Sequence, residues 1–287
     1  MVVKWNRHPF FGLRLTERSF RCFAIGSRSH MRFRPCIDIH DGKVKQIVGS
    51  TLHDGAEPVT NFETALPPSD FARMYREDNL YGGHVIMLGG GNEEAALDAL
   101  AAFPGGLQTG GGITPGNAAR FLDAGASHVI VTSYVFRGGR VEWDNLRSMT
   151  QTVGKERLVL DLSCRKQGND YIVVTDRWQK DTEEALSPAL FERLGHCCDE
   201  FLVHAAHVEG MRGGIDMELL ELLSGCGSKP ITYAGGVRSI DDLESLFSAG
   251  RGRIDFTVGS ALDLFGGSLS YRDVVAWVKE RRIGEAQ

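Results

Sequence analysis

Two aspartates occupy equivalent positions in two similar stretches of this sequence. Asp38 ends the apolar run 35–37, and Asp161 ends the run 158–160, 123 residues further on. A carboxylate beside apolar residues costs desolvation energy unless it is paired or takes part in chemistry. Two carboxylates that flank one substrate suit a general base and a general acid. The alternative for each is a structural acid that accepts hydrogen bonds from loop amides.

Small residues repeat with nearly the same spacing as the aspartates. The repeated pairs lie 124 and 127 residues apart: Gly111-Gly112 with Gly235-Gly236, and Thr132-Ser133 with Gly259-Ser260. Glycine lets backbone N–H groups approach an anion closely, and a following helix N-terminus favours negative charge. We therefore expect these pairs to form two symmetry-related phosphate-binding sites. The alternative is that each glycine only makes a tight turn.

A histidine pair next to an acid resembles a metal site at first sight. His204 and His207 lie beside Glu209. Residues three apart on a strand point to opposite faces, so the two imidazoles are poorly placed for joint chelation. We expect His204 to be structural or to assist a neighbouring group. No metal site is predicted.

The elements that must position these residues alternate along the chain. Short runs rich in Val and Ile predict strands at residues 34–39, 84–88, 107–110, 128–132, 158–162, 201–204, 231–234 and 255–258. Helices are predicted between them, for example at 69–78, 117–124 and 241–248, with starts marked by Thr114-Pro115 and by Ser239. Such alternation requires parallel strands with right-handed crossovers.

Eight units in about 257 residues favour closure into a barrel. The predicted fold class is therefore α/β, a (β/α)8 TIM barrel built from two half-barrel repeats and spanning residues 31–287. An open doubly wound sheet is the alternative. In a barrel the active site lies at the C-terminal ends of the strands, which is where both aspartates and the repeated pairs are expected.

A long excursion follows the fifth predicted strand. Its Gly168-Asn169 turn and the run 171–174 predict a small hairpin flap that carries Arg165 and Trp178. We expect both residues near the substrate. Trp178 could stack on a planar heterocycle or only hold the flap together.

Composition limits the partners of the protein. The net charge is −5 over 287 residues, which gives no basic surface for nucleic acid or an acidic membrane. The apolar runs are too short to span a membrane. The six cysteines show no CxxC spacing, so we expect no disulfides. We expect a monomer that acts on a small bisphosphorylated molecule without a cofactor.

The first thirty residues differ from the remainder. They hold six basic side chains against one acid and have no long apolar core. Such a segment is typical of an organellar transit peptide and unlike a secretory signal. The alternative is an upstream extension with Met31 as the working start.

These motifs carry a family resemblance. The stretch 35–49 resembles the opening of the phosphoribosylformimino-5-aminoimidazole carboxamide ribotide isomerases of histidine biosynthesis, and the similarity covers residues 32–279. It includes the segments 110–113, 129–133, 159–166, 177–179, 208–210, 213–216, 233–236 and 258–261. The likeness is greatest to plant-type members and implies a plastid location, with the cytoplasm as the alternative.

The resemblance implies an Amadori rearrangement, from aminoaldose to aminoketose, on a substrate with two phosphoribosyl arms. Asp38 would be the base that moves the C2 proton, and Asp161 the acid that opens the ribose ring. Glu209 would assist. His204 stands where bacterial members carry Thr, and His207 and Thr109 depart from the Asp and Val of eukaryotic relatives.

Two other functions compete with the isomerase. The related cyclase has the same half-barrel repeat and the same two aspartates, but it typically carries a lysine where this chain has Gln46. A non-enzymatic phosphate-sensing barrel would not need both strand-end carboxylates.

Overall fold

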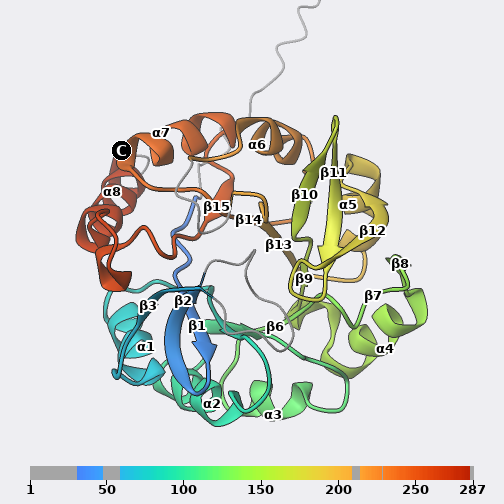
Figure 1. The fold of residues 1–287 in the computed structure, drawn as a ribbon, viewed down its shortest axis with the longest axis horizontal. Helices are drawn as coiled ribbons and strands as arrows, with labels where there is room; N and C mark the ends of the chain where they lie inside the picture. The colour runs from blue at the N-terminus through green and yellow to red at the C-terminus, as the bar shows by residue number, and fades with distance from the viewer. Residues whose placement is uncertain (1–30, 48–58, 209–213, 228, 285–287) are drawn as a thin grey trace, which may run out of the picture.

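The computed structural model describes residues 31–47, 59–208, 214–227 and 229–284. In this part of the chain, eight parallel strands form an inner ring and eight helices surround it (Figure 1). All eight predicted strands are present. They are β1 (Cys36–His40), β4 (Gly83–Met87), β5 (Leu107–Gly110), β6 (Val129–Val131), β9 (Leu158–Asp161), β13 (Glu200–His204), β14 (Ile231–Ala234) and β15 (Ile254–Phe256).

The ring is closed next to its first strand. The strands follow one another in chain order from β1 to β15. Phe33, just before β1, forms a parallel bridge with Phe256 of β15. The Arg34 N–H donates to the Phe256 carbonyl at 2.8 Å, and the Phe256 N–H donates to the Arg32 carbonyl at 3.0 Å. The predicted barrel is therefore confirmed over the open doubly wound sheet.

The helices lie outside the ring, each between two strands or after the last. The three helices predicted by range correspond to α1, α3 and α7, with each boundary shifted by one residue. The full set is α1 (Pro68–Glu77), α2 (Glu93–Ala102), α3 (Ala118–Asp123), α4 (Trp143–Val153), α5 (Pro188–Gly195), α6 (Met217–Ser224), α7 (Ile240–Ala249) and α8 (Tyr271–Gly284).

One predicted helix start is correct and one is wrong. The Ser239 hydroxyl accepts a hydrogen bond from the Asp242 N–H at 3.1 Å and caps α7. Thr114 does not cap α3, because the chain first makes a turn and the helix begins at Ala118. The Asn117 side chain stabilises that turn by accepting from the Thr114 N–H at 2.8 Å.

The interior of the barrel is filled by a small layer of apolar side chains. Ile130, Val159, Leu202 and Ala234 form a buried cluster, with Ile86 packed against it. These residues come from β4, β6, β9, β13 and β14, and such layers are typical of barrels of this kind. The larger core lies between the strands and the helices.

A buried ionic network lies at the start of the strands, the end of the barrel away from the predicted site. The Arg34 side chain, 1% exposed, donates to Asp255 at 2.6 Å and to both Glu200 oxygens at 2.6 and 3.2 Å. Gln108 donates to Glu200 at 2.7 Å. Burial pushes the pKa of Glu200 upward, but Arg34 and Gln108 outweigh it and hold this pKa below its usual range. The network links β15, β13, β5 and the residues before β1.

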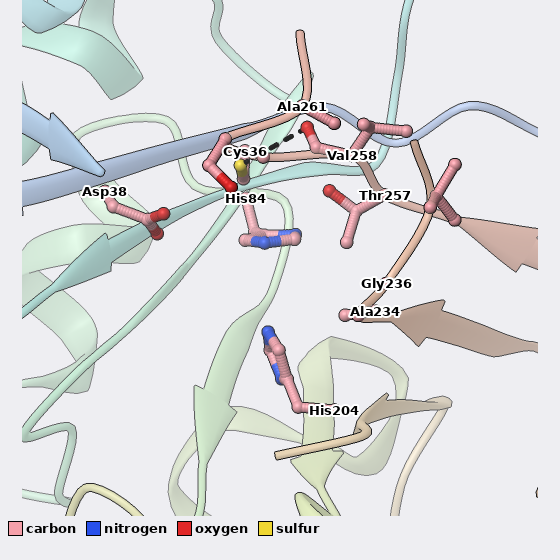
Figure 2. Close-up of a pocket in the computed structure, with 13 residues that line it drawn as sticks. Cys36, Asp38, His84, His204, Ala234, Gly236, Thr257, Val258 and Ala261 are labelled. Carbon is pink, nitrogen blue, oxygen red and sulfur yellow. Dashed lines mark hydrogen bonds between the residues drawn. The ribbon is translucent and has the colours of Figure 1, made fainter. Parts of the chain in front are cut away.

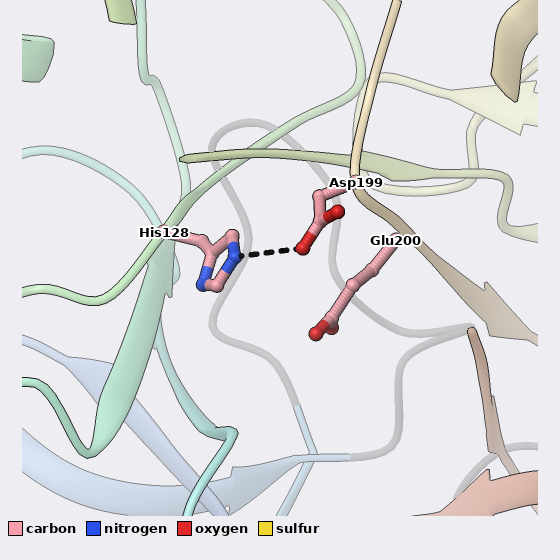
Figure 3. A group of neighbouring side chains, drawn as sticks. All are labelled: His128, Asp199 and Glu200. Atoms are coloured by element: carbon pink, nitrogen blue, oxygen red, sulfur yellow. Dashed lines mark hydrogen bonds and ion pairs between the residues drawn. The ribbon is translucent and has the colours of Figure 1, made fainter. Parts of the chain in front are cut away.

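His128 and Asp199 lie beside this network, and with Glu200 they form a group of metal-ligand types (Figure 3). His128 Nε2 lies 3.3 Å from Asp199 Oδ2. Glu200 already binds the Arg34 guanidinium, and Lys229 Nζ lies 3.9 Å from Asp199. Two cations thus compensate the acids, so we interpret the group as structural.

Shorter elements extend from the barrel. The predicted flap is present and larger than expected, because β10 (Cys164–Gln167), β11 (Asp170–Thr175) and β12 (Lys180–Ala185) form a three-stranded sheet. The strands β2 (Lys43–Ile47) and β3 (Thr60–Glu63) continue from β1, and β7 (Phe136–Arg137) pairs with β8 (Arg140–Val141). None of the helices in the described ranges has the length and apolar character needed to cross a bilayer.

Candidate functional site

Two adjoining cavities open where the strands end. The larger has a volume of about 460 Å³ and the smaller about 40 Å³. Asp38 of β1 and His204 of β13 line both cavities. The two cavities therefore meet between these side chains. They lie at the C-terminal ends of the strands, where TIM-barrel enzymes have their active sites.

The wider cavity brings together the first set of predicted residues. It is lined by Gly111, Gly112, Thr132 and Ser133, by Asp38 and Asp161, and by Trp178 of the flap. Both aspartates thus face one space. Its floor includes the apolar side chains of Ile86 and Ile130.

The narrower cavity brings together the second set (Figure 2). It is lined by Gly235, Gly236, Gly259 and Ser260. The two predicted phosphate sites are therefore on separate walls of the mouth, as the sequence repeat indicated. Phosphate binding itself stays a prediction.

The glycines differ in how closely other atoms surround them. Gly112 has φ +73°, and a Cβ added there would meet no atom within 4 Å, because the position faces open space. Gly236 has φ +75°, but its added Cβ would lie 2.0 Å from the Gly214 carbonyl oxygen. Glycine is therefore needed at Gly236 for loop packing, while at Gly112 it leaves room for a ligand.

Asp38 is held by a side chain from the neighbouring strand. Gln46 of β2 is buried, and its Nε2 donates to Asp38 Oδ2 at 2.8 Å. A Cβ at Gly259 would lie 2.5 Å from Gln46 Oε1. The second predicted phosphate site and the Gln46–Asp38 pair are therefore packed together.

Asp161 is an ionised, hydrogen-bonded group. Its Oδ1 accepts from the Ser163 N–H at 2.8 Å and from the Ser163 hydroxyl at 2.7 Å, and lies 3.7 Å from His204 Nδ1. Burial pushes the pKa of Asp161 upward, but His204 and Ser163 outweigh it and hold this pKa below its usual range.

The two histidines of the metal-like motif face different partners. His204 faces the cavities, whereas His207 Nε2 lies 2.8 Å from Asp216 Oδ2, which also accepts from the Tyr171 hydroxyl at 2.8 Å. The prediction that the pair does not chelate one ion agrees with this arrangement. Glu209 lies outside the described residues.

Arg165 is not among the residues that line the two cavities, and it supports the flap. Its guanidinium donates to the Trp178 carbonyl at 2.6 Å and lies 3.2 Å from Asp181. The turn it holds has three successive residues with positive φ, Asp176, Arg177 and Trp178, at 50°, 58° and 64°. The Asp176 N–H donates to the Ser133 hydroxyl at 3.1 Å, so the turn contacts the first predicted phosphate site.

Several residues of the site were not predicted from the sequence. His84 of β4 is 2% exposed, lines the narrow cavity and faces His204 with 6.3 Å between ring centroids (Figure 2). Burial, with His204 nearby, lowers the pKa of His84 to about 3, so the ring is neutral. Thr257 also lines this cavity. Both fall within the predicted strand ranges, although Thr257 directly follows β15, and their polar character within apolar runs was the available signal.

Comparison with known proteins agrees with the geometry. The histidine biosynthesis protein family matches residues 32–269. The chain is 50% identical over 293 residues to the chloroplastic 1-(5-phosphoribosyl)-5-((5-phosphoribosylamino)methylideneamino)imidazole-4-carboxamide isomerase of Medicago truncatula, covering 99% of this chain and 94% of that protein. Isomerases of the same name from Neurospora crassa and Saccharomyces cerevisiae are 48% and 43% identical, each over 86% of this chain and 98% and 97% of their own lengths. The chain belongs to the histidine biosynthesis protein family.

Proposed function

We propose that the protein is an isomerase of histidine biosynthesis that converts a bisphosphorylated imidazole carboxamide aminoaldose into the aminoketose. The observation that carries this proposal is the pair Asp38 and Asp161, which line one cavity between two glycine-rich walls. A substrate with a phosphate at each end, and a reacting carbon between them, matches that arrangement.

Asp38 supplies the base of the reaction. An Amadori rearrangement removes the proton from C2 of the opened sugar, which requires a carboxylate beside that carbon. Asp38 lines both cavities, and Gln46 Nε2 donates to its Oδ2 at 2.8 Å. Gln46 therefore keeps the base in one orientation.

The phosphates bind at the two walls. Backbone N–H groups around Gly112 and Gly236 donate to the anions, and the hydroxyls of Ser133 and Ser260 add further hydrogen bonds. Trp178 lines the wider cavity, where its ring offers a stacking surface for the imidazole carboxamide.

The related cyclase is the competing function. It is disfavoured by Gln46, which takes the place of a lysine and is already paired with Asp38. The names of the Medicago, Neurospora and Saccharomyces relatives also support the isomerase.

A direct assay tests the proposal. Purified protein is mixed with the bisphosphorylated aminoaldose, and the products are followed by mass spectrometry and by a reagent specific for ketoses. We expect the ketose to appear with no change in mass. A product of lower mass would indicate a lyase, and binding without conversion would indicate a phosphate sensor.

The protein acts in the chloroplast and binds no macromolecule for its chemistry. Its basic first thirty residues and the chloroplastic Medicago relative support this location. Residues 1–30 fused to a fluorescent reporter should direct it into plastids, and a wholly cytosolic reporter would contradict the proposal. Residues 31–287 form the enzyme, which we expect to be a monomer by light scattering.

A further inference from the structure

Two buried polar side chains face the narrower cavity without a protein partner. His84 of β4 is 2% exposed, and Thr257, which follows β15, is 5% exposed. In the part of the chain that the structure describes, the Thr257 hydroxyl has no hydrogen-bond partner. No hydrogen bond within the same ranges reaches either nitrogen of the His84 ring. A buried polar group without a partner costs free energy, so we expect both groups to bind something that enters the cavity.

The chemistry of these two side chains suits an uncharged hydroxyl group. Burial lowers the pKa of His84 to about 3, so its ring is neutral near neutral pH. A neutral imidazole offers one N–H donor and one acceptor nitrogen, and the Thr257 hydroxyl can donate and accept. A hydroxyl group of a ligand also donates and accepts. The volume of the narrower cavity, about 40 Å³, admits a group of that size.

The narrower cavity lies where the reacting arm of the proposed substrate would bind. Trp178, the stacking surface for the imidazole carboxamide, lines only the wider cavity. Asp38 lines both cavities, so the reacting arm runs from Asp38 into the narrower one, and its phosphate reaches the wall that Gly236 lines. Figure 2 shows the His84 ring between Asp38 and Thr257. The two neutral groups therefore face the stretch of the sugar between the reacting carbon and the phosphate.

We infer that His84 and Thr257 bind the C3 hydroxyl of the reacting sugar arm and make the enzyme specific for a sugar that carries this group. The inference rests on the proposed isomerase function and deepens it. In that substrate C2 lies beside Asp38 and C5 carries the phosphate, so C3 and C4 lie between them. The C4 oxygen belongs to the ring until the ring opens, which leaves the C3 hydroxyl free to bind. The two side chains orient the sugar and exchange no proton with it.

The test measures kcat/KM for the complete aminoaldose and for an analogue that lacks the C3 hydroxyl on the reacting arm. Wild-type enzyme should use the analogue about 10- to 100-fold less well, because two buried polar groups then lose their partner. Thr257→Val and His84→Leu should each lower kcat/KM for the complete substrate by about 10- to 100-fold. The same variants should change kcat/KM for the analogue by less than about threefold, since the contact they remove is already absent.

Two further variants separate a contact with substrate from a role in folding. Thr257→Ser keeps the hydroxyl and should discriminate between the two substrates as the wild-type enzyme does. Thr109→Val is the matched control, because Thr109 is 0% exposed, its hydroxyl lacks a partner within the described ranges, and it lines neither cavity. Both valine variants should keep or raise the melting temperature, since each replaces an unpaired buried hydroxyl by a methyl group. Only Thr257→Val should lose activity.

Three results would overturn the inference: equal use of both substrates by the wild-type enzyme, an equal loss on both substrates in Thr257→Val, or the same loss of activity in Thr109→Val. The Thr257 variants decide the test if His84→Leu fails to fold. Wild-type protein that forms no ketose from the complete substrate would instead refute the proposed function.

Discussion

The Gln46 amide helps to orient Asp38. Gln46 donates to one carboxylate oxygen of Asp38 at 2.8 Å. Replacing Asp38 by Asn removes the negative charge and alters this hydrogen bond, with little change in side-chain volume. Asp38→Asn should lower kcat by about 10²- to 10⁴-fold. Its melting temperature should stay close to that of the wild-type protein. Wild-type growth of a histidine auxotroph that carries this variant would remove Asp38 from the mechanism.

Gly112 allows phosphate binding to be separated from backbone strain. Gly112→Ala places a methyl group in the cavity and should raise KM about tenfold, a cost of about 1.4 kcal/mol in binding. Gly105 is the matched control, since it also has φ +73° and nothing within 4 Å of an added Cβ. Both variants should lose similar stability, about 1–2 kcal/mol in the free energy of unfolding. A KM that stays unchanged in Gly112→Ala would argue against phosphate binding at the wall that Gly112 lines.

Among single residues, those with a local signal could be predicted. Asp38 and Asp161 end apolar runs, and glycine pairs after strands are conspicuous, so the repeat revealed them. The pairing of Gln46 with Asp38 depends on the antiparallel return of β2, and the neutrality of His84 depends on burial inside a closed ring. Neither can be derived from neighbouring residues. Arg165 was expected near the substrate, and its bond to the carbonyl of Trp178 also depends on the folding of the flap.

Among the elements, the strands were predicted more accurately than the helix starts. A parallel strand that is buried on both faces has a nearly continuous apolar run, and this signal allowed all eight strands to be predicted. Thr114-Pro115 looked like a helix start, but Asn117 binds back to Thr114 and delays the helix. Such competition between side-chain and backbone hydrogen bonds is decided by about 1 kcal/mol, the typical contribution of one helix cap.

The network of Arg34, Glu200 and Asp255 joins elements distant in sequence and should control acid stability. The pKa of Glu200 is depressed in the folded state. Its contribution to the free energy of unfolding is therefore fully present above its unfolded pKa of about 4.3, and is lost as the pH falls through the folded-state pKa. Glu200→Gln should lower the free energy of unfolding by about 3 kcal/mol at pH 7. The difference from wild type should shrink towards pH 3 in urea titrations. Glu183→Gln, which disrupts an exposed pair with Arg140, should have little effect at either pH.

For the whole molecule, the barrel is expected to function without the first thirty residues. The Met31 N–H already donates to the Gly252 carbonyl at 3.0 Å, and the Met31 side chain is buried against the core. A chain that starts at Met31 should therefore keep its kcat and its melting temperature within error. Calorimetry and the ketose assay check this. A truncated chain that failed to fold would mean that the leading segment packs on the barrel.

The bridge between Phe33 and Phe256 makes the strand ring continuous, so the covalent order of the strands is arbitrary. Each crossover after a parallel strand returns the chain to the end of the barrel where the strands begin, so we expect α8 to end near the start of β1. A circular permutant that joins residue 287 to Met31 by a short glycine linker, and opens at Gly154 between the two halves, should fold and isomerise. Its new ends would lie far from the mouth. Ketose formation or crystals from this permutant would show that the barrel also folds and works when the chain begins between its two halves.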